Sequence, residues 1–177
     1  MLGIVGYGGF VASAAALCLT PGIDTVYILT RTMAGGRREG LASALGINTG
    51  LVVHTVLVAA GLSLVLAASP VAFGAIKVAG AAYLAVMGVR SILSGGSSLS
   101  VGEKDEGAPA ASALRVYAQG VLTNVLNPKI ILFFLALLPQ FVATSNDFGP
   151  LPFLALGLTY VALSTLWTVV IVAVASP

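Results

Sequence analysis

The sequence predicts an all-α, polytopic membrane protein. Hydrophobic residues make up 58% of the 177-residue chain and charged residues 8%, whereas soluble domains carry roughly 25% charged residues. Long apolar runs separated by short charged stretches are typical of helices that cross a bilayer. A transmembrane β-barrel would show segments of about ten residues in which apolar and polar residues alternate, and the sequence has no such pattern. We therefore expect a transmembrane helix bundle whose main partner is the lipid bilayer.

The same composition excludes several classes of protein. A net charge of +2 is too small to predict nucleic-acid binding. Cys18 is the only cysteine, so no intramolecular disulfide forms, and with His54 as the only histidine we expect no metal site and no cofactor. The sequence has no Gly-x-Ser-Gly nucleophile and no second histidine. An intramembrane enzyme is therefore not expected.

Five spans are expected, and two of them contain proline. Their approximate ranges are 2–29, 41–68, 71–93, 114–141 and 151–175. Because proline removes a backbone donor, helix one must break at Pro21-Gly22 and helix four at Asn127-Pro128. In the second span, small residues recur every four positions and allow close helix packing, which leaves a homodimer open; they are Ala42, Gly46 and Gly50.

The spans group into two membrane repeats. Residues 1–93 hold three spans and residues 114–177 hold two. Between them, residues 94–113 are rich in Gly, Ser and charged residues, a composition typical of a flexible linker. We read residues 1–20 as part of a retained first span, because the stretch has no positive n-region.

The distribution of basic residues predicts the orientation. Lys and Arg gather in or beside the first and third connectors, at Arg31, Arg37, Arg38, Arg90, Lys104 and Arg115. The second and fourth connectors have neither. By the positive-inside rule, the first and third connectors are cytoplasmic and the N-terminus is outside.

The break in the first span carries an acid. Thr20 can cap a new helix and Pro21 suits its first position. Asp24 then falls in the first turn, where the helix dipole favours a carboxylate. An acid inside a membrane segment costs roughly 2.5–3.5 kcal/mol on insertion scales, so we interpret it as functional. The alternative is a proline kink with Asp24 near the headgroups.

The break in the fourth span carries a base. Asn127 precedes Pro128 and Lys129 follows it, with Asn124 one turn earlier. Both prolines lie on the order of 15–20 Å from the cytoplasmic flank, near the middle of the bilayer. Proline-interrupted helices in corresponding positions of two halves indicate an inverted-repeat transporter. Asp24 and Lys129 are expected to pair in the empty site and to exchange for the charges of an amino acid.

Other polar residues have two interpretations each. Imidazole titrates near neutral pH, so His54 is either in a proton path or a structural hydrogen-bonding group. Lys77 is expected to extend to the interface. Tyr83 fits a packing position as well as a site. The asparagines Asn48 and Asn124 serve either binding or interhelical hydrogen bonds.

Several motifs together resemble the LysE/RhtB family of amino-acid exporters. They are Thr20-Pro21-Gly22-Ile23-Asp24-Thr25, Gly36-Arg37-Arg38-Glu39-Gly40-Leu41, Gly46-Ile47-Asn48-Thr49-Gly50 with His54, Gly80-Ala81-Ala82-Tyr83-Leu84, and Asn124-Val125-Leu126-Asn127-Pro128-Lys129 with Leu138-Pro139-Gln140-Phe141. The resemblance covers nearly the whole chain. The family's Pro-Gly-x-Asp motif falls on Pro21, Gly22 and Asp24, and its Asn-Pro-Lys motif on Asn127, Pro128 and Lys129.

The resemblance implies a secondary transporter that exports amino acids or their derivatives across the bacterial inner membrane, with proton antiport as the driving reaction. The expected substrate-binding residues are Asp24, Thr20, Gly22, Asn124, Asn127, Lys129 and Tyr83; Asp24 and His54 are expected to couple protons. Family members usually have six spans, and the sequence here has five. The alternatives are a passive small-solute channel and a non-transporting membrane subunit or truncated copy.

Overall fold

The described part of the chain is helical. The structure, a computed structural model, describes residues 2–93 and 112–176. Outside the helices, these residues form one isolated bridge, between Ile4 and Val142. The elements are α1 (Tyr7–Leu19), α2 (Ile23–Ala68), α3 (Pro70–Leu93), α4 (Ala113–Val125), α5 (Pro128–Leu137), the 3₁₀ helix η1 (Leu138–Phe141) and α6 (Leu151–Ala175). The predicted all-α class is confirmed. Most of the expected linker lies outside the described residues.

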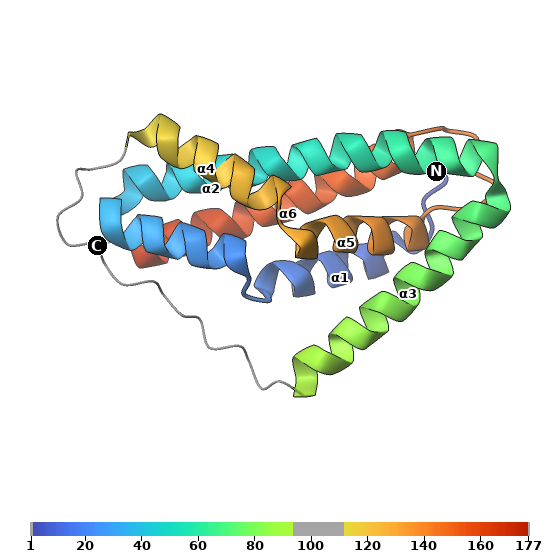
Figure 1. Cartoon of the computed structure of the whole chain (residues 1–177), viewed down its shortest axis with the longest axis horizontal. Coiled ribbons are helices and arrows are strands. Elements are labelled where there is room, and N and C mark those ends of the chain that lie inside the picture. Colours follow the sequence, from blue (N-terminus) through green and yellow to red (C-terminus); the bar gives the residue numbers. More distant parts are fainter. Residues whose placement is uncertain (1, 94–111, 177) are drawn as a thin grey trace.

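The predicted connector between the first two spans is a single residue. Within α2, the non-helical backbone lies at Gly36, with φ 65° and ψ −163°. Glycine adopts this positive φ readily because it has no Cβ. From Gly36, two arms of α2 run in opposite directions, a first arm (23–35) and a second arm (37–68) (Figure 1). The prediction of a loop around Arg31 and Arg37 was wrong, because Gly36 alone reverses the chain and the residues on both sides of it are helical.

Several helices have membrane-crossing length. Among the described residues, α2 and α6 are long and apolar enough to cross a membrane. A third span results if α4 is counted together with α5 and η1, to which it is joined at a bend of 52°. The helices α1 and α3 also contain apolar stretches, of 10–17 residues. The break predicted at Asn127-Pro128 is this bend, and Ser69 alone separates α2 from α3.

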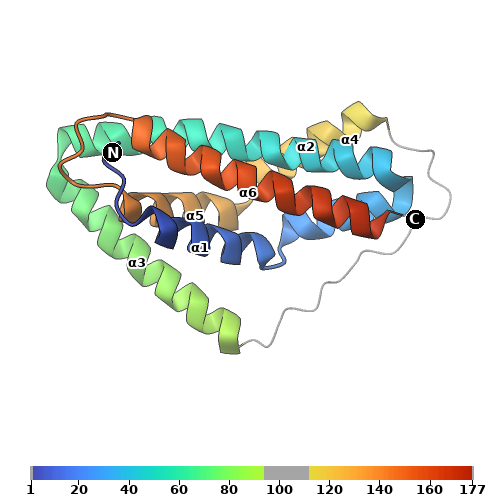
Figure 2. The same cartoon turned by 180° about the vertical axis from the view of Figure 1, so that it is seen from behind.

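Glycine brings the helices into close contact. The helix α2 packs against both α4 and α6. A Cβ on Gly46 would overlap the carbonyl oxygen of Tyr117 and lie 3.0 Å from the Cα of Gly120. A Cβ on Gly80 would lie 2.7 Å from the Cα of Ala136, which brings α3 onto α5. Farther along, α3 diverges from the bundle in both side views (Figures 1 and 2).

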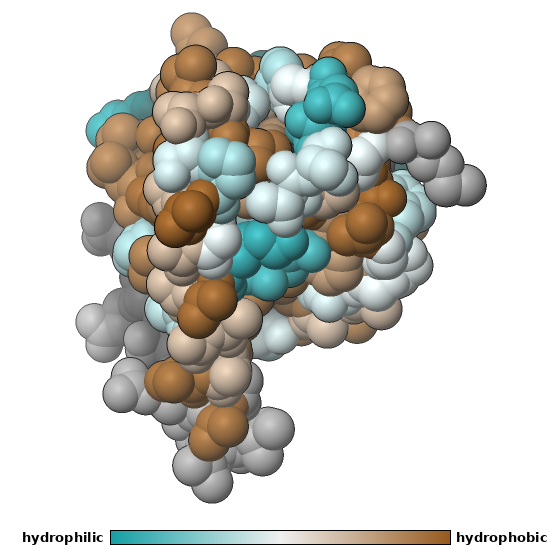
Figure 3. All heavy atoms as spheres, turned by 90° about the vertical axis from the view of Figure 1, so that its right-hand side faces the viewer, coloured by the Kyte–Doolittle hydropathy of each residue, from teal (hydrophilic) through white to brown (hydrophobic). Residues whose placement is uncertain are grey.

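The outer surface suits lipid more than water. Large apolar side chains are exposed along several helices, including Leu64 at 70%, Leu166 at 67% and Val174 at 82%. Figure 3 views the end of the bundle where α2 meets α3, and there hydrophilic residues form patches surrounded by hydrophobic ones. The core between the helices is aromatic and aliphatic, with Phe10, Phe73, Phe134 and Phe153 fully buried.

Candidate functional site

At the first helix break, no described side chain caps the helix that follows. Thr20 ends α1, and its Oγ1 donates to the carbonyl of Ala16 at 2.8 Å. Gly22 is the N-cap of α2, in an extended conformation with φ −147° and ψ −173°. The prediction that Thr20 caps the second half-helix was therefore wrong, because its hydroxyl bonds backwards into its own helix. Asp24 lies in the first turn of α2, as expected.

The second helix break is capped by a side chain. Asn127 is the N-cap of α5, and its Oδ1 accepts a hydrogen bond from the amide of Lys129 at 3.0 Å. Its carbonyl accepts from the amides of Ile130 and Ile131. Pro128 follows at the first helical position, where its missing N–H costs nothing. Asn127 therefore caps α5 with its side chain.

The two breaks meet at Asp24. Asn124 donates its Nδ2 to one Asp24 oxygen at 2.9 Å, and Asn127 donates its Nδ2 to the other at 3.2 Å. Lys129 instead donates its Nζ to the carbonyl of Thr20 at 3.3 Å. Among the described residues the ion pair that forms is Arg31 with Glu39. The expected Asp24–Lys129 pair does not form, because amides from the opposite half bind both carboxylate oxygens.

A small cavity opens at this meeting point. It encloses about 40 Å³, room for a few water molecules, so binding a larger solute requires its walls to move apart. The lining residues predicted from sequence are Thr20, Gly22, Asp24, Asn127 and Lys129. Asn124 is fully buried and contacts the site through Asp24. The Lys129 ammonium lies close to the backbone of Gly22, because a Cβ there would be 3.3 Å from the Lys129 Nζ.

His54 supports the site from behind. Its Nε2 lies 3.1 Å from the carbonyl oxygen of Asn124, and the side chain is 5% exposed. Gly50 makes room for Asn124, because a Cβ there would lie 2.6 Å from its Oδ1. His54 is not among the residues that line the cavity. Its role in a proton path stays a prediction.

Tyr83, a predicted binding residue, and Lys77 both lie on α3, away from the cavity. Tyr83 is on α3, and it is not among the lining residues. The helix α3 packs on α5 and η1. Lys77, also on α3, donates its Nζ to the carbonyl of Val142 at 3.1 Å, near the end of η1. This bond ties α3 to the loop before α6.

The sequence reasoning missed a cavity wall on α6. The lining residues from this helix are Tyr160, Ser164, Trp167 and Thr168. Their spacing of i, i+4, i+7 and i+8 puts them on one helix face. This spacing of polar and aromatic residues in an otherwise apolar span was the available signal.

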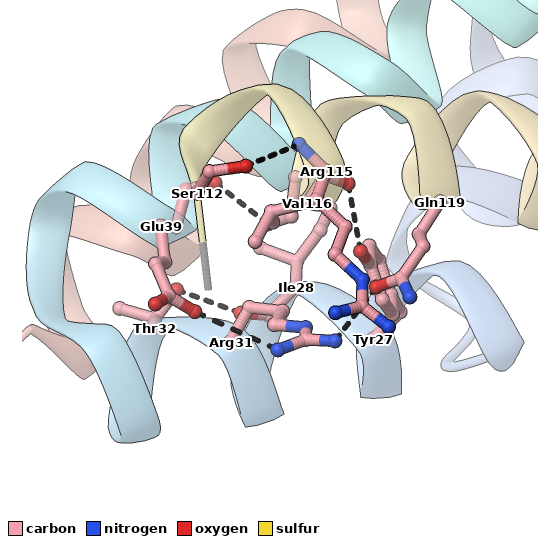
Figure 4. A network of polar contacts seen from close by, with 11 residues as sticks. Tyr27, Ile28, Arg31, Thr32, Glu39, Ser112, Arg115, Val116 and Gln119 are labelled. Carbon is pink, nitrogen blue, oxygen red and sulfur yellow. Dashed lines mark hydrogen bonds and ion pairs between the residues drawn. The ribbon is translucent and has the colours of Figure 1, made fainter. Parts of the chain in front are cut away.

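A polar network joins the arms of α2 to α4 (Figure 4). Arg31 donates to Gln119 Oε1 at 2.7 Å and lies 3.7 Å from Glu39 across the Gly36 reversal. Tyr27 donates its hydroxyl to the carbonyl of Val116 at 2.7 Å. The network therefore joins both arms of α2 to the helix that precedes the second break.

Bilayer-length helices around a charged cavity at two helix breaks define the class: a helical membrane transporter. The chain belongs to the LysE-type translocator family, because the family model described as "LysE type translocator" matches residues 15–177. Members of this family are transporters, so the chain is not an enzyme. The resemblance predicted from the motifs is confirmed.

Several relatives are similar to this chain. An uncharacterized membrane protein, YrhP, of Bacillus subtilis (strain 168) is 36% identical over 144 residues, 78% of this chain and 68% of the relative. A homoserine/homoserine lactone efflux protein of Salmonella typhi is 34% identical over 133 residues, 75% of this chain and 63% of the relative. A leucine efflux protein of Klebsiella pneumoniae is 28% identical over 162 residues, 92% of this chain and 75% of the relative. No solved structure matches the chain.

Proposed function

We propose that this chain exports amino acids or their derivatives across the bacterial plasma membrane, as a secondary transporter that exchanges substrate for protons. The observation that carries the proposal is that Asp24 and Lys129, from two different helix breaks, line one cavity. An amino acid has an ammonium and a carboxylate close together, and this cavity offers one partner of each sign. Relatives named for homoserine, homoserine lactone and leucine efflux support the substrate class.

The carboxylate of the substrate binds Lys129 and the start of α2. No described residue accepts a hydrogen bond from the amides of Ile23, Asp24 and Thr25. Free amides at a helix N-terminus favour an anion, and the helix dipole adds to the attraction. The Thr20 carbonyl holds the Lys129 ammonium beside these amides. The site thus has a cationic and an anionic side.

The ammonium of the substrate binds Asp24. Asn124 and Asn127 hold the two carboxylate oxygens in place, and hydrogen bonds to a charged group are worth about 1.5–3 kcal/mol. Asp24 also exchanges a proton when the substrate has left, with His54 behind Asn124 as the second titratable group. Protonated Asp24 does not attract an ammonium, so proton binding and substrate binding exclude each other.

The architecture of the proposal is an inverted repeat of five spans. The pair α1 and first arm of α2 corresponds to α4 and α5, and the second arm of α2 corresponds to α6. In such a repeat, the unbroken helix of each half packs against the broken helix of the other half. The packing of α2 on α4 and of α1 on α6 supports this arrangement. In this proposal the N-terminus lies outside and the Arg31 network lies at the cytoplasmic end of the bundle. A homodimer through small-residue faces is part of the proposal.

Efflux from proteoliposomes tests the proposal. Proteoliposomes that contain the wild-type protein are loaded with radiolabelled leucine or homoserine. They should release the amino acid under an imposed pH gradient, and the release should slow when the gradient is collapsed. Replacing Asp24→Asn should abolish the pH-driven component, and the matched change Asp147→Asn in the exposed loop should not. Wild-type efflux by Asp24→Asn would refute the role of Asp24. Efflux that ignores the pH gradient would instead identify a passive channel.

A further inference from the structure

The α6 wall of the cavity is neutral and can form hydrogen bonds. All four of its residues, Tyr160, Ser164, Trp167 and Thr168, carry a donor group and line the cavity. The Tyr160 hydroxyl has the Cys18 thiol as its hydrogen-bond partner. The charged residues Asp24 and Lys129 come from α2 and α5. The two kinds of wall therefore come from different helices.

Two donors on this wall have no partner within the described residues. The Nε1 of Trp167 is buried and forms no hydrogen bond, although an indole N–H is a donor that buried sites nearly always satisfy. The hydroxyl of Ser164 also forms no hydrogen bond to a described residue, and Ser164 is 7% exposed. By contrast, Thr168 donates to the Thr165 carbonyl and accepts from Asn48, both at 3.1 Å. The wall therefore has two unused donors.

We propose that Ser164 and Trp167 select the side chain of the substrate. This inference rests on the proposed function: with the ammonium at Asp24 and the carboxylate at Lys129, the side chain of the amino acid projects toward the remaining wall. Unused donors there fit a side chain that carries a hydrogen-bond acceptor, such as a hydroxyl or the carbonyl of an ester or lactone. A purely aliphatic side chain leaves both donors unpaired.

An isosteric pair of substrates tests this inference. Homoserine and norvaline differ by a hydroxyl in place of a methyl group, so their efflux ratio measures recognition of the oxygen alone. Wild-type protein should favour homoserine by about 3- to 10-fold, the ratio expected of one neutral hydrogen bond. Trp167→Phe keeps an aromatic ring without the N–H, and Ser164→Ala removes the hydroxyl. Each change should lower the ratio toward one while norvaline efflux continues.

The control is Thr165→Val on the exposed side of α6, where the hydroxyl bonds to the Val161 carbonyl in its own helix; the ratio should stay at the wild-type value. An unchanged ratio in both Trp167→Phe and Ser164→Ala would overturn the inference, and so would an equal loss of both substrates, which marks a packing role. Those results leave the proposed function in place. Absence of efflux of either amino acid by the wild type would overturn the proposed function and this inference with it.

Discussion

The two helix breaks contain the same residue, proline, in different positions. At the first break, Pro21 precedes the helix and Gly22 serves as an N-cap that has no side chain. At the second break, Pro128 is the first residue of the helix and Asn127 binds the amides that follow. One break therefore leaves its helix N-terminus open, and the other closes it.

The difference assigns separate tasks to the two breaks. The open break provides free amides and the carboxylate of Asp24. The closed break provides the Lys129 ammonium and, through Asn127, a hydrogen bond that fixes Asp24. Asn127 takes part in both functions, because its oxygen caps α5 and its nitrogen binds the other half. Substitutions at the two breaks should therefore have unequal effects.

The largest effect on stability is expected at Asn127. Asn127→Ala removes the cap, worth about 0.5–2 kcal/mol, and the bond to the Asp24 carboxylate, worth about 1.5–3 kcal/mol. The free energy of unfolding should fall by roughly 2–4 kcal/mol in an SDS titration of the protein in mixed micelles. Asn127→Ser keeps a capping oxygen and should recover about 1 kcal/mol. Equal losses in the two variants would mean that the cap contributes nothing.

An intermediate effect is expected where α4, which leads into the closed break, contacts α2. Gly46→Ala places a methyl group against the backbone of Tyr117 and Gly120. Overpacking of this kind costs about 1–3 kcal/mol, measurable in the same titration. Gly61→Ala is the matched control on the same helix, because nothing lies within 4 Å of its Cβ position. If both variants lose the same stability, the close approach of the two helices is refuted.

The smallest effect is expected at Thr20, the counterpart of Asn127 in the open break. Its hydroxyl donates to the Ala16 carbonyl in its own helix, and its contact with Lys129 uses the main-chain oxygen. Thr20→Val should change the free energy of unfolding by less than about 0.5 kcal/mol. A loss comparable with that of Asn127→Ala would show that the hydroxyl caps α2.

The comparison also shows what the sequence predicts and what it does not. Pro21 and Pro128 mark both breaks because proline is incompatible with a continuous helix. The structure decides which polar residue caps the helix that follows each break. Thr20 and Asn127 look equivalent in sequence, yet only the side chain of Asn127 bonds to an amide of the following helix. The reversal at Gly36 depends on one backbone conformation, which composition does not reveal.

The α6 wall was harder to predict for another reason. Trp167 and Ser164 are uncharged residues in an apolar helix, so packing explains them equally well until α6 is placed beside the breaks. The charges at Asp24 and Lys129 stand out because a membrane makes them costly. Sequence reasoning therefore finds the charged part of the site more readily than the neutral part.

Binding of leucine and two analogues to purified protein tests the central claim most directly, that Asp24 and Lys129 bind opposite ends of one amino acid. Isopentylamine lacks the carboxylate and 4-methylpentanoate lacks the ammonium. The wild type should bind leucine more tightly than either analogue. Asp24→Asn should lose the preference for leucine over 4-methylpentanoate and keep the preference over isopentylamine. Lys129→Gln should show the reverse pattern. Loss of both preferences in both variants, or of neither in either, would contradict the claim.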